Sequence, residues 1–227
     1  MISSPRTEFL AGLKAISPIL LRVVPFATIT GIAAVEAKLP AGLAIASSVI
    51  IFAGASQLAA MQLIRENGAF AVIVLTVLVI NLRFTMYSIS LAPYFKNLAS
   101  WWKGLLAYML TDQAYALSII RYTESPEQPA KHWFFFGASV GLWVTWQLGT
   151  IVGVLVGAQV PANWSLDFAI PLTFIAVTVP AIKSRRELIV AVVSVGIAVA
   201  AAGLPYNLGL IVAALVGVLV GMVLEAA

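Results

Sequence analysis

Apolar runs separated by short polar segments dominate this chain. Each run is close to the length, about 20 residues, at which a helix crosses a hydrocarbon core of about 30 Å. The pattern predicts an all-α fold: a polytopic transmembrane helical bundle of about eight spans, or seven if one run is re-entrant or two fuse. The predicted spans are Ala15–Val35, Ala41–Ile64, Ala69–Ser90, Gly104–Arg121, Trp133–Ala158, Leu166–Ile182, Leu188–Leu204 and Leu208–Leu224.

Composition agrees with a bilayer as the solvent of this chain. Of its 227 residues, 62% are hydrophobic and only 10% are charged, and the mean hydropathy is +1.03. About a quarter of an ordinary soluble domain is charged. Cysteine is absent, which excludes disulfides, thiolate metal sites and cysteine nucleophiles. Because every connector except residues 121–132 is short, we expect residues 1–227 to form a single integral membrane domain with antiparallel neighbouring spans.

The basic residues between the spans predict an orientation. With the N-terminus inside, the outer face carries only Lys38, Lys96 and Lys103. Basic residues concentrate on the cytoplasmic side of membrane proteins, so we expect a cytoplasmic N-terminus. The basic residues assigned to the inner face are Arg6, Lys14, Arg22, Arg65, Arg121, Lys131, Lys183, Arg185 and Arg186.

The second span contains a candidate helix break. Gly54 lowers helix propensity near mid-span, and Ser56 could cap a helix that restarts after a break. A broken helix exposes backbone amides at Gly54, Ala55, Ser56 and Gln57, and such amides suit a substrate carboxylate. The alternative is a small-residue packing face in which Gln57 forms a hydrogen bond between helices.

The third and fourth spans carry polar residues close to the bilayer centre. Charged groups are costly at that depth and commonly face a cavity or a partner. Asn81, Arg83 and Tyr87 belong to the third span, and Asp112 is the deepest acid of the chain. Arg83 could bind a carboxylate or extend to the membrane surface. Asp112 could relay a proton, bind an ammonium group, or form a purely structural pair with Arg83.

Further polar positions allow an internal repeat. Gln57 precedes Asn81 by 24 residues, and Gln147 precedes Asp167 by 20. The spans that carry the two glutamines would run in opposite directions, as in inverted-repeat transporters. Asp167 itself opens the sixth span, either as a site residue or as an interfacial helix start.

Several functional classes lack their motifs. The chain has no P-loop, no HExxH or other metal cluster and no GxSxG, and its single histidine is His132. We therefore expect neither an enzyme nor a cofactor. Two alternatives to a secondary transporter remain: a permease subunit of an ATP-driven importer that relies on a separate ATPase, and a membrane enzyme or scaffold.

Four segments together resemble the AzlC family, the large subunits of branched-chain amino-acid exporters. They are Phe52–Gln57, Asn81–Ser88, Leu110–Gln113 and Asp167–Pro171. Their order and spacing match the family over essentially the whole chain. The resemblance implies secondary export of branched-chain or other small hydrophobic amino acids across the inner membrane of a bacterium. It also implies a small AzlD-type membrane subunit as partner.

The resemblance and the polar residues together suggest one mid-membrane site. Backbone amides at 54–57 and Arg83 would bind the substrate carboxylate, and Asp112 would take the ammonium group or a proton. Two positions depart from the family, which usually has a histidine where this chain has Phe84 and an acid where it has Gln113. Both departures remove titratable groups, so proton coupling through these positions is in doubt.

Overall fold

The structure of the chain is a computed structural model that describes residues 4–127, 129–159, 179, 182, 184–204 and 208–226. In this part of the chain, four helices are long and apolar enough to cross a membrane. The predicted all-α membrane bundle is confirmed. The predicted span 166–182 falls largely outside the described residues, and the site candidate Asp167 falls outside them as well.

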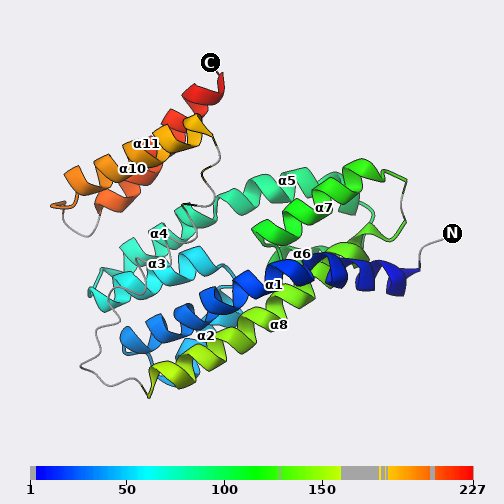
Figure 1. The fold of residues 1–227 in the computed structure, drawn as a ribbon, viewed down its shortest axis with the longest axis horizontal. Coiled ribbons are helices and arrows are strands. Elements are labelled where there is room, and N and C mark those ends of the chain that lie inside the picture. Colours follow the sequence, from blue (N-terminus) through cyan, green and yellow to red (C-terminus); the bar gives the residue numbers. More distant parts are fainter. Residues whose placement is uncertain are drawn as a thin grey trace. The chain divides into compact units, whose positions relative to one another are not determined.

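The helices follow the predicted apolar runs closely, and three of the runs are split. The second and fourth runs form separate half-helices, whereas a single turn residue at Leu82 divides the third, so that Phe70–Phe95 still counts as one of the four long apolar helices. The helices are α1 (Pro5–Glu36), α2 (Ala41–Ile50), α3 (Gly54–Arg65), α4 (Phe70–Asn81), α5 (Arg83–Phe95), α6 (Ser100–Tyr108), α7 (Asp112–Glu124), α8 (Lys131–Gly157), α10 (Arg185–Ala200) and α11 (Leu208–Ala226) (Figure 1).

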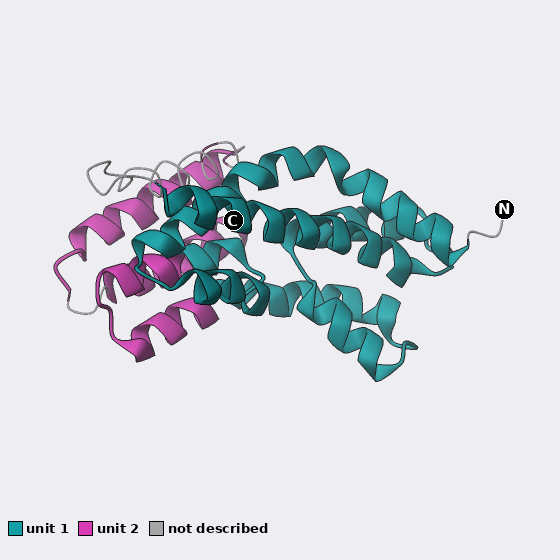
Figure 2. Ribbon diagram, turned by 90° about the horizontal axis from the view of Figure 1, so that it is seen from below, with its two compact units in different colours: residues 1–58, 80–161 teal, residues 59–79, 162–227 magenta. Residues whose placement is uncertain are grey.

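The chain divides into two compact units (Figure 2). Unit 1 comprises residues 1–58 and 80–161, and unit 2 comprises residues 59–79 and 162–227. Unit 1 holds α1, α2, the first turn of α3, and α5 to α8. The site candidates in the described part of the chain all lie in unit 1. The expectation of a single domain stays a prediction.

In unit 1, α1 and α8 lie side by side and run in the same direction (Figure 1). A Cβ atom placed on Gly12 would be 2.0 Å from the carbonyl oxygen of Phe134, and one on Gly31 would be 2.3 Å from that of Thr150. Glycines let membrane helices approach this closely. The α8 glycines at this contact with α1 are Gly137, Gly141, Gly149, Gly153 and Gly157. Their recurrence at every fourth residue over 149–157 is a packing signal that the hydropathy pattern did not reveal.

The second predicted span reverses direction instead of crossing. Residues 51–53 are not helical, so the predicted break beside Gly54 is confirmed. The side-chain nitrogen of Gln57 donates to the hydroxyl of Ser47 at 3.1 Å. Residues ten positions apart in a straight helix are about 15 Å apart along its axis. The hydrogen bond therefore requires α2 and the first turn of α3 to form a hairpin.

The fourth predicted span also turns back. Its first half, α6, lies alongside α8. Trp102 near the start of α6 contacts His132 near the start of α8, with ring centroids 5.2 Å apart. Tyr108 at the end of α6 accepts a 3.0 Å hydrogen bond from the indole nitrogen of Trp143. The contacts advance along both helices, so α6 and α8 run in the same direction.

The second half of this segment, α7, returns to the start of α8. The hydroxyl of Tyr122, near the end of α7, donates to the carbonyl oxygen of Lys131 at 2.6 Å. The connection between α6 and α7 at residues 109–111 is not α-helical. The helices α6 and α7 therefore form a second hairpin, and Tyr108 and Asp112 lie on different helices.

The two hairpins enter unit 1 from opposite ends. We call the end with Glu8, Phe95, Trp102, Arg121 and His132 the N-terminal end, and the end with Glu36, Lys38 and Gly157 the opposite end. Half-helices of 9 to 13 residues measure about 14–20 Å, roughly half of a hydrocarbon core. Two of the eight predicted runs are thus re-entrant, where the sequence analysis expected them to cross. This also means that neighbouring elements are not uniformly antiparallel.

The helices α10 and α11 of unit 2 form an antiparallel pair. A Cβ atom on Gly209 would be 2.4 Å from the carbonyl oxygen of Ala201, and one on Gly217 would be 2.3 Å from the hydroxyl of Ser194. A capping box closes the start of α10, where the Ser184 hydroxyl accepts from the backbone of Glu187. This pair uses the same close glycine packing as unit 1.

Candidate functional site

The tips of the two hairpins touch in the middle of unit 1. The hydroxyl of Tyr108, at the end of α6, donates to the carbonyl oxygen of Val49 in α2 at 2.6 Å. The rings of Tyr108 and Phe52 lie 6.4 Å apart. Because α8 supplies the Trp143 nitrogen to the same hydroxyl, this contact joins both hairpins to the longest helix pair of the unit.

An ion pair lies immediately beside this contact. Arg83 at the start of α5 and Asp112 at the start of α7 are joined by a 2.9 Å distance from Nη1 to Oδ2. Their side chains are 31% and 38% exposed. The Thr111 hydroxyl caps α7 by accepting from the backbone of Ala114. Asp112 is the first residue of α7, and a helix N-terminus is a favourable position for an acidic side chain.

Aromatic rings hold α5 and α7 parallel around this pair. Tyr87 lies beside Asp112, and its ring stacks on that of Tyr115 with centroids 4.3 Å apart. The hydroxyl of Tyr115 donates to Ser90 at 3.1 Å. Seven residues further along each helix, the rings of Tyr94 and Tyr122 make a similar contact, with their centroids 5.0 Å apart. These contacts fix the spacing of the two helices that carry the opposite charges.

Three atoms at or near the ion pair make no hydrogen bond within the described part of the chain. The Nε of Arg83 is a buried donor in this state, and Oδ1 of Asn81 and Oδ1 of Asp112 are buried acceptors. The Arg83 guanidinium also lies over the Phe84 ring, 5.2 Å from its centroid. Burying a polar group without a partner costs free energy. Arg83 and Asn81 therefore retain hydrogen-bonding capacity for a group that enters between α5 and α7.

The Gln57 part of the predicted site is occupied by protein contacts. Gln57 is fully buried and bonds to Ser47. The Ser56 hydroxyl donates to the carbonyl oxygen of Ala53 at 3.0 Å, so it does not cap α3 as suggested. A Cβ atom on Gly54 would be 2.5 Å from the rings of Phe26 and Trp146, which cover the helix start. The side-chain oxygen of Gln57 is buried and makes no hydrogen bond within the described residues. The substrate-site interpretation and the packing interpretation of this region both stay predictions.

The sequence analysis did not predict a further hydrogen-bonded contact, which joins the first hairpin to α8. Gln147 of α8 accepts from the Ser48 hydroxyl at 2.5 Å and donates to the Ser48 carbonyl at 3.2 Å. Both side chains are buried. A glutamine inside an apolar run was the available signal, but the sequence did not identify its partner across 99 positions.

The structure thus brings together part of the predicted set of site residues. Arg83, Tyr87 and Asp112 form one cluster between α5 and α7, and Asn81 precedes it on α4. Residues 54–57 lie at the tip of the other hairpin, which contacts Tyr108 of α6 through Val49 and Phe52. Asp167 lies outside the described residues. The assignment of all of them to a substrate site stays a prediction.

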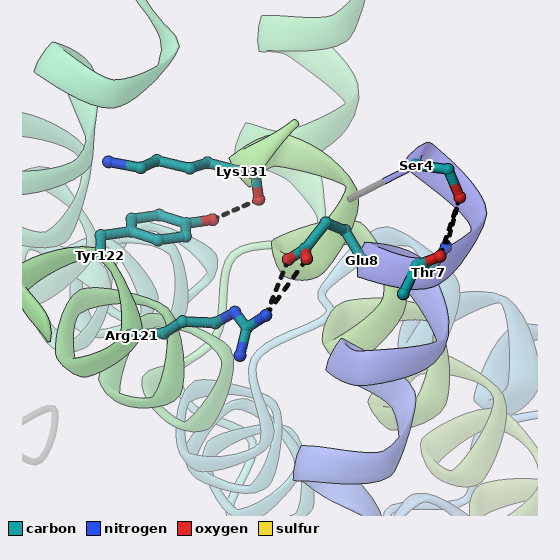
Figure 3. Close-up of polar contacts among 6 residues, drawn as sticks. All are labelled: Ser4, Thr7, Glu8, Arg121, Tyr122 and Lys131. Carbon is teal, nitrogen blue, oxygen red and sulfur yellow. Dashed lines mark hydrogen bonds and ion pairs between the residues drawn. The ribbon is translucent and has the colours of Figure 1, made fainter. Parts of the chain in front are cut away.

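A second charged cluster lies at the N-terminal end (Figure 3). The Arg121 guanidinium donates to both carboxylate oxygens of Glu8, at 3.2 and 3.0 Å, and lies over the Phe134 ring. Glu8 is only 2% exposed. The Lys131 ammonium lies 4.7 Å from the centroid of the Tyr94 ring. The cluster ties the end of α7 to α1 and α8, and so anchors the half-helix that begins with Asp112.

Metal chemistry finds no support in the described ranges. Among these residues, no group of three His, Asp or Glu side chains could hold an ion. The expectations that the protein has no cofactor and is not an enzyme stay predictions.

Comparisons with known proteins give the family. A family model described as AzlC protein matches residues 18–160. The inner membrane protein YgaZ of Escherichia coli (strain K12) is 25% identical over 194 residues, which cover 83% of this chain and 79% of YgaZ. An uncharacterized membrane protein of Archaeoglobus fulgidus is 32% identical over 221 residues, 94% of each chain. One of Helicobacter pylori (strain 26695) is 31% identical over 156 residues, 67% of each chain.

No solved structure matches this chain. The family model covers more than half of the chain, and the relatives are membrane proteins along most of its length. Together with the apolar helices, these matches show a membrane protein with a transport function. The chain belongs to the AzlC family.

Proposed function

We propose that this protein exports branched-chain or other small hydrophobic amino acids across the cytoplasmic membrane. In this proposal it is the large subunit of a two-component secondary exporter, and a small AzlD-type membrane protein is its partner. The Arg83–Asp112 pair at the tip of a re-entrant hairpin is the observation that carries the proposal. Membership of the AzlC family supports it.

The pair complements a zwitterion. An amino acid presents a carboxylate and an ammonium group a few ångströms apart, and the guanidinium of Arg83 and the carboxylate of Asp112 are the matching groups. Arginine binds carboxylates through a planar set of donors, and its free Nε is available for this. In the absence of substrate, Arg83 and Asp112 neutralise each other. The site therefore never leaves a lone charge in hydrocarbon, which would be costly.

The opposed hairpins provide a route for alternating access. Each hairpin blocks one half of the membrane thickness, and their tips meet at the Tyr108–Val49 hydrogen bond. Movement of α6 and α7 would open the site toward the N-terminal end, and movement of α2 and α3 toward the opposite end. Irregular backbone at membrane depth is tolerated where it lines a cavity or is buried in protein, which agrees with breaks at 51–53 and 109–111.

In this proposal, any proton that is transported with the substrate binds at Asp112. Phe84 occupies the position at which the family usually has a histidine, and here its ring contacts Arg83. Gln113 occupies the position of the second acid. Asp112 is thus the titratable carboxylate that remains in the Arg83 cluster.

The re-entrant hairpins support a cytoplasmic N-terminus. Because α6 and α7 both begin or end at the N-terminal end, Lys96 and Lys103 lie there and not on the outer face, which revises the charge assignment made from sequence. The opposite end carries Lys38, and the α2–α3 hairpin also returns Arg65, which the sequence analysis assigned to the inner face, to that end. The basic residues at or near the N-terminal end are Arg6, Lys14, Lys96, Lys103, Arg121 and Lys131. This asymmetry follows the positive-inside rule.

Efflux from proteoliposomes tests the function. Vesicles loaded with leucine, valine, lysine or glutamate are assayed with and without the small subunit and with an imposed proton gradient. We expect leucine and valine efflux that requires the small subunit, and no lysine or glutamate efflux. Equal efflux of all four, or none with both subunits present, would defeat the proposal. Tyr94→Phe, which preserves the ring, serves as an active control.

A further inference from the structure

A pocket of about 360 Å³ lies between α5, α6 and α8 at the N-terminal end of unit 1. Its buried wall is apolar and consists of Leu91, Phe95, Leu106, Leu110 and Phe135. It extends along α6 from Lys103 to Ala107, a rise of about 6 Å, and reaches Leu110 in the connection that follows α6. The pocket is separate from the Arg83 cluster, which supplies none of its lining residues.

The charges of the pocket have one sign. Two of its lining residues are charged, and both are lysines, Lys96 and Lys103. The Lys103 ammonium donates to the Lys96 carbonyl at 2.8 Å, so one of its three N–H groups is occupied and two remain for another acceptor. A zwitterion would bring its ammonium group next to these lysines without a lining carboxylate to receive it. The ligand that fits is an anion with a long apolar part.

The depth of the pocket in the membrane indicates which kind of anionic amphiphile it would bind. Trp101, Trp102 and Trp133 cluster beside the lysines, with the Trp102 ring 4.5 Å from Trp101 and 5.0 Å from Trp133. Tryptophan clusters mark the level of the lipid headgroups. The lysines therefore lie at headgroup depth, and the apolar wall extends toward the bilayer centre. Basic pockets between membrane helices on the cytoplasmic side suit anionic headgroups.

We propose that this pocket binds one anionic phospholipid of the leaflet at the N-terminal end. Its phosphate contacts Lys96 and Lys103, and one acyl chain lies along Leu91, Leu106 and Leu110. This acyl chain packs against α6, next to the turn at 109–111 that precedes Asp112. The lipid thereby stabilises the α6–α7 hairpin. This inference is independent of the proposed substrate, because it concerns a pocket that the transport site does not use.

Lipid binding to the purified full chain, followed by native mass spectrometry in detergent, tests the inference. Phosphatidylglycerol and phosphatidylcholine with identical acyl chains are titrated in parallel. One basic residue near a membrane surface strengthens anion binding about fivefold, so two lysines give a preference of about 30-fold for phosphatidylglycerol. In the Lys96→Gln/Lys103→Gln variant we expect the two lipids to bind equally. Lys38→Gln, which removes an exposed lysine at the opposite end, should retain the full preference.

A second variant tests the apolar wall. Ala107 lines the pocket and is exposed, so Ala107→Trp fills the space without replacing a buried residue and should weaken both lipids. Glycerophosphoglycerol, the headgroup without acyl chains, should not compete at equal concentration. Equal binding of the two lipids to the unmodified chain would overturn the inference, as would a preference that survives loss of both lysines. Displacement of the lipid by leucine would also overturn it, because the pocket would then be an amino-acid entry site.

Discussion

The Arg83–Asp112 pair can be separated experimentally into its structural and its transport roles. The perturbation is a double-mutant cycle of Arg83→Gln, Asp112→Asn and the double variant, each of which removes charge and keeps some hydrogen-bonding capacity. A single substitution leaves one uncompensated charge at mid-membrane, whereas the double variant leaves none. Stability and transport should therefore respond differently to the second substitution.

The magnitude follows from the geometry of the pair. The charged atoms are 2.9 Å apart, and the side chains are about one-third exposed. Exposed pairs contribute up to about 1 kcal/mol, and breaking a fully buried pair costs about 3–5 kcal/mol. We expect each single variant to lose about 2 kcal/mol of unfolding free energy, between these limits. The double variant should lose about the same amount as one single variant, which gives a coupling energy of about 2 kcal/mol.

The assay combines unfolding by SDS titration with leucine efflux at matched membrane abundance. If the pair binds the zwitterion, the double variant is no less stable than the single variants but transports at less than about one-hundredth of the unmodified rate. That loss corresponds to removal of two charge-assisted contacts of about 1.5 kcal/mol each. Efflux at the unmodified rate from the double variant would show that the pair is only structural, and the site assignment would be wrong.

Three further substitutions test the packing of unit 1. A Cβ atom in Gly153→Ala would meet the Thr28 carbonyl oxygen at 2.0 Å, so SDS titration should show a loss of about 1–3 kcal/mol, whereas Gly104→Ala, where nothing lies within 4 Å, should lose none. Tyr108→Phe removes the hydrogen bond between the hairpin tips and should cost about 1 kcal/mol by the same titration. Arg121→Met removes the cation from Glu8, which is 2% exposed, and should cost about 3 kcal/mol. An unchanged midpoint for Gly153→Ala would contradict the close packing of α1 against α8. Unchanged midpoints for Tyr108→Phe and Arg121→Met would contradict the Tyr108–Val49 hydrogen bond and the Arg121–Glu8 ion pair.

The sequence predicted the membrane class and the positions of the helices, because the length of an apolar run depends directly on bilayer thickness. It also predicted the break at Gly54. Because a lone charge is costly at mid-membrane, it raised two alternatives for Asp112: a free site residue or a partner of Arg83. Arg83 and Asp112 could be proposed as partners from chemistry alone. Their contact through two half-helices could not.

The reversals at 51–53 and 109–111 could not be predicted from hydropathy. Two half-helices of about ten residues have the same apolar length as one crossing helix, so hydropathy gives the extent of a run without its direction. One signal was available: Lys96 and Lys103 lay on the face that the crossing topology made external. The parallel path of α1 and α8 also depends on close backbone contacts at Gly12, and neither composition nor periodicity reports which helix a glycine faces.

The two hairpins bear on the hypothesis of an inverted repeat. The hairpins α2–α3 and α6–α7 enter from opposite ends, as halves of an inverted repeat would. The sequence hypothesis paired Gln57 and Asn81 with Gln147 and Asp167, and Asp167 lies outside the described residues. The repeat therefore stays a prediction, and the hairpins give it a structural basis different from the one the glutamines suggested.

Labelling of single cysteines tests the re-entrant α6–α7 hairpin most directly, because the chain contains no cysteine of its own. Asn97→Cys, Glu127→Cys and Gly42→Cys are treated with a membrane-impermeant thiol reagent in right-side-out and inverted vesicles. The hairpin predicts that Asn97→Cys and Glu127→Cys react from the same side and Gly42→Cys from the other. Reaction of Asn97→Cys and Glu127→Cys from opposite sides would show that the segment between them crosses the membrane, and would contradict the account.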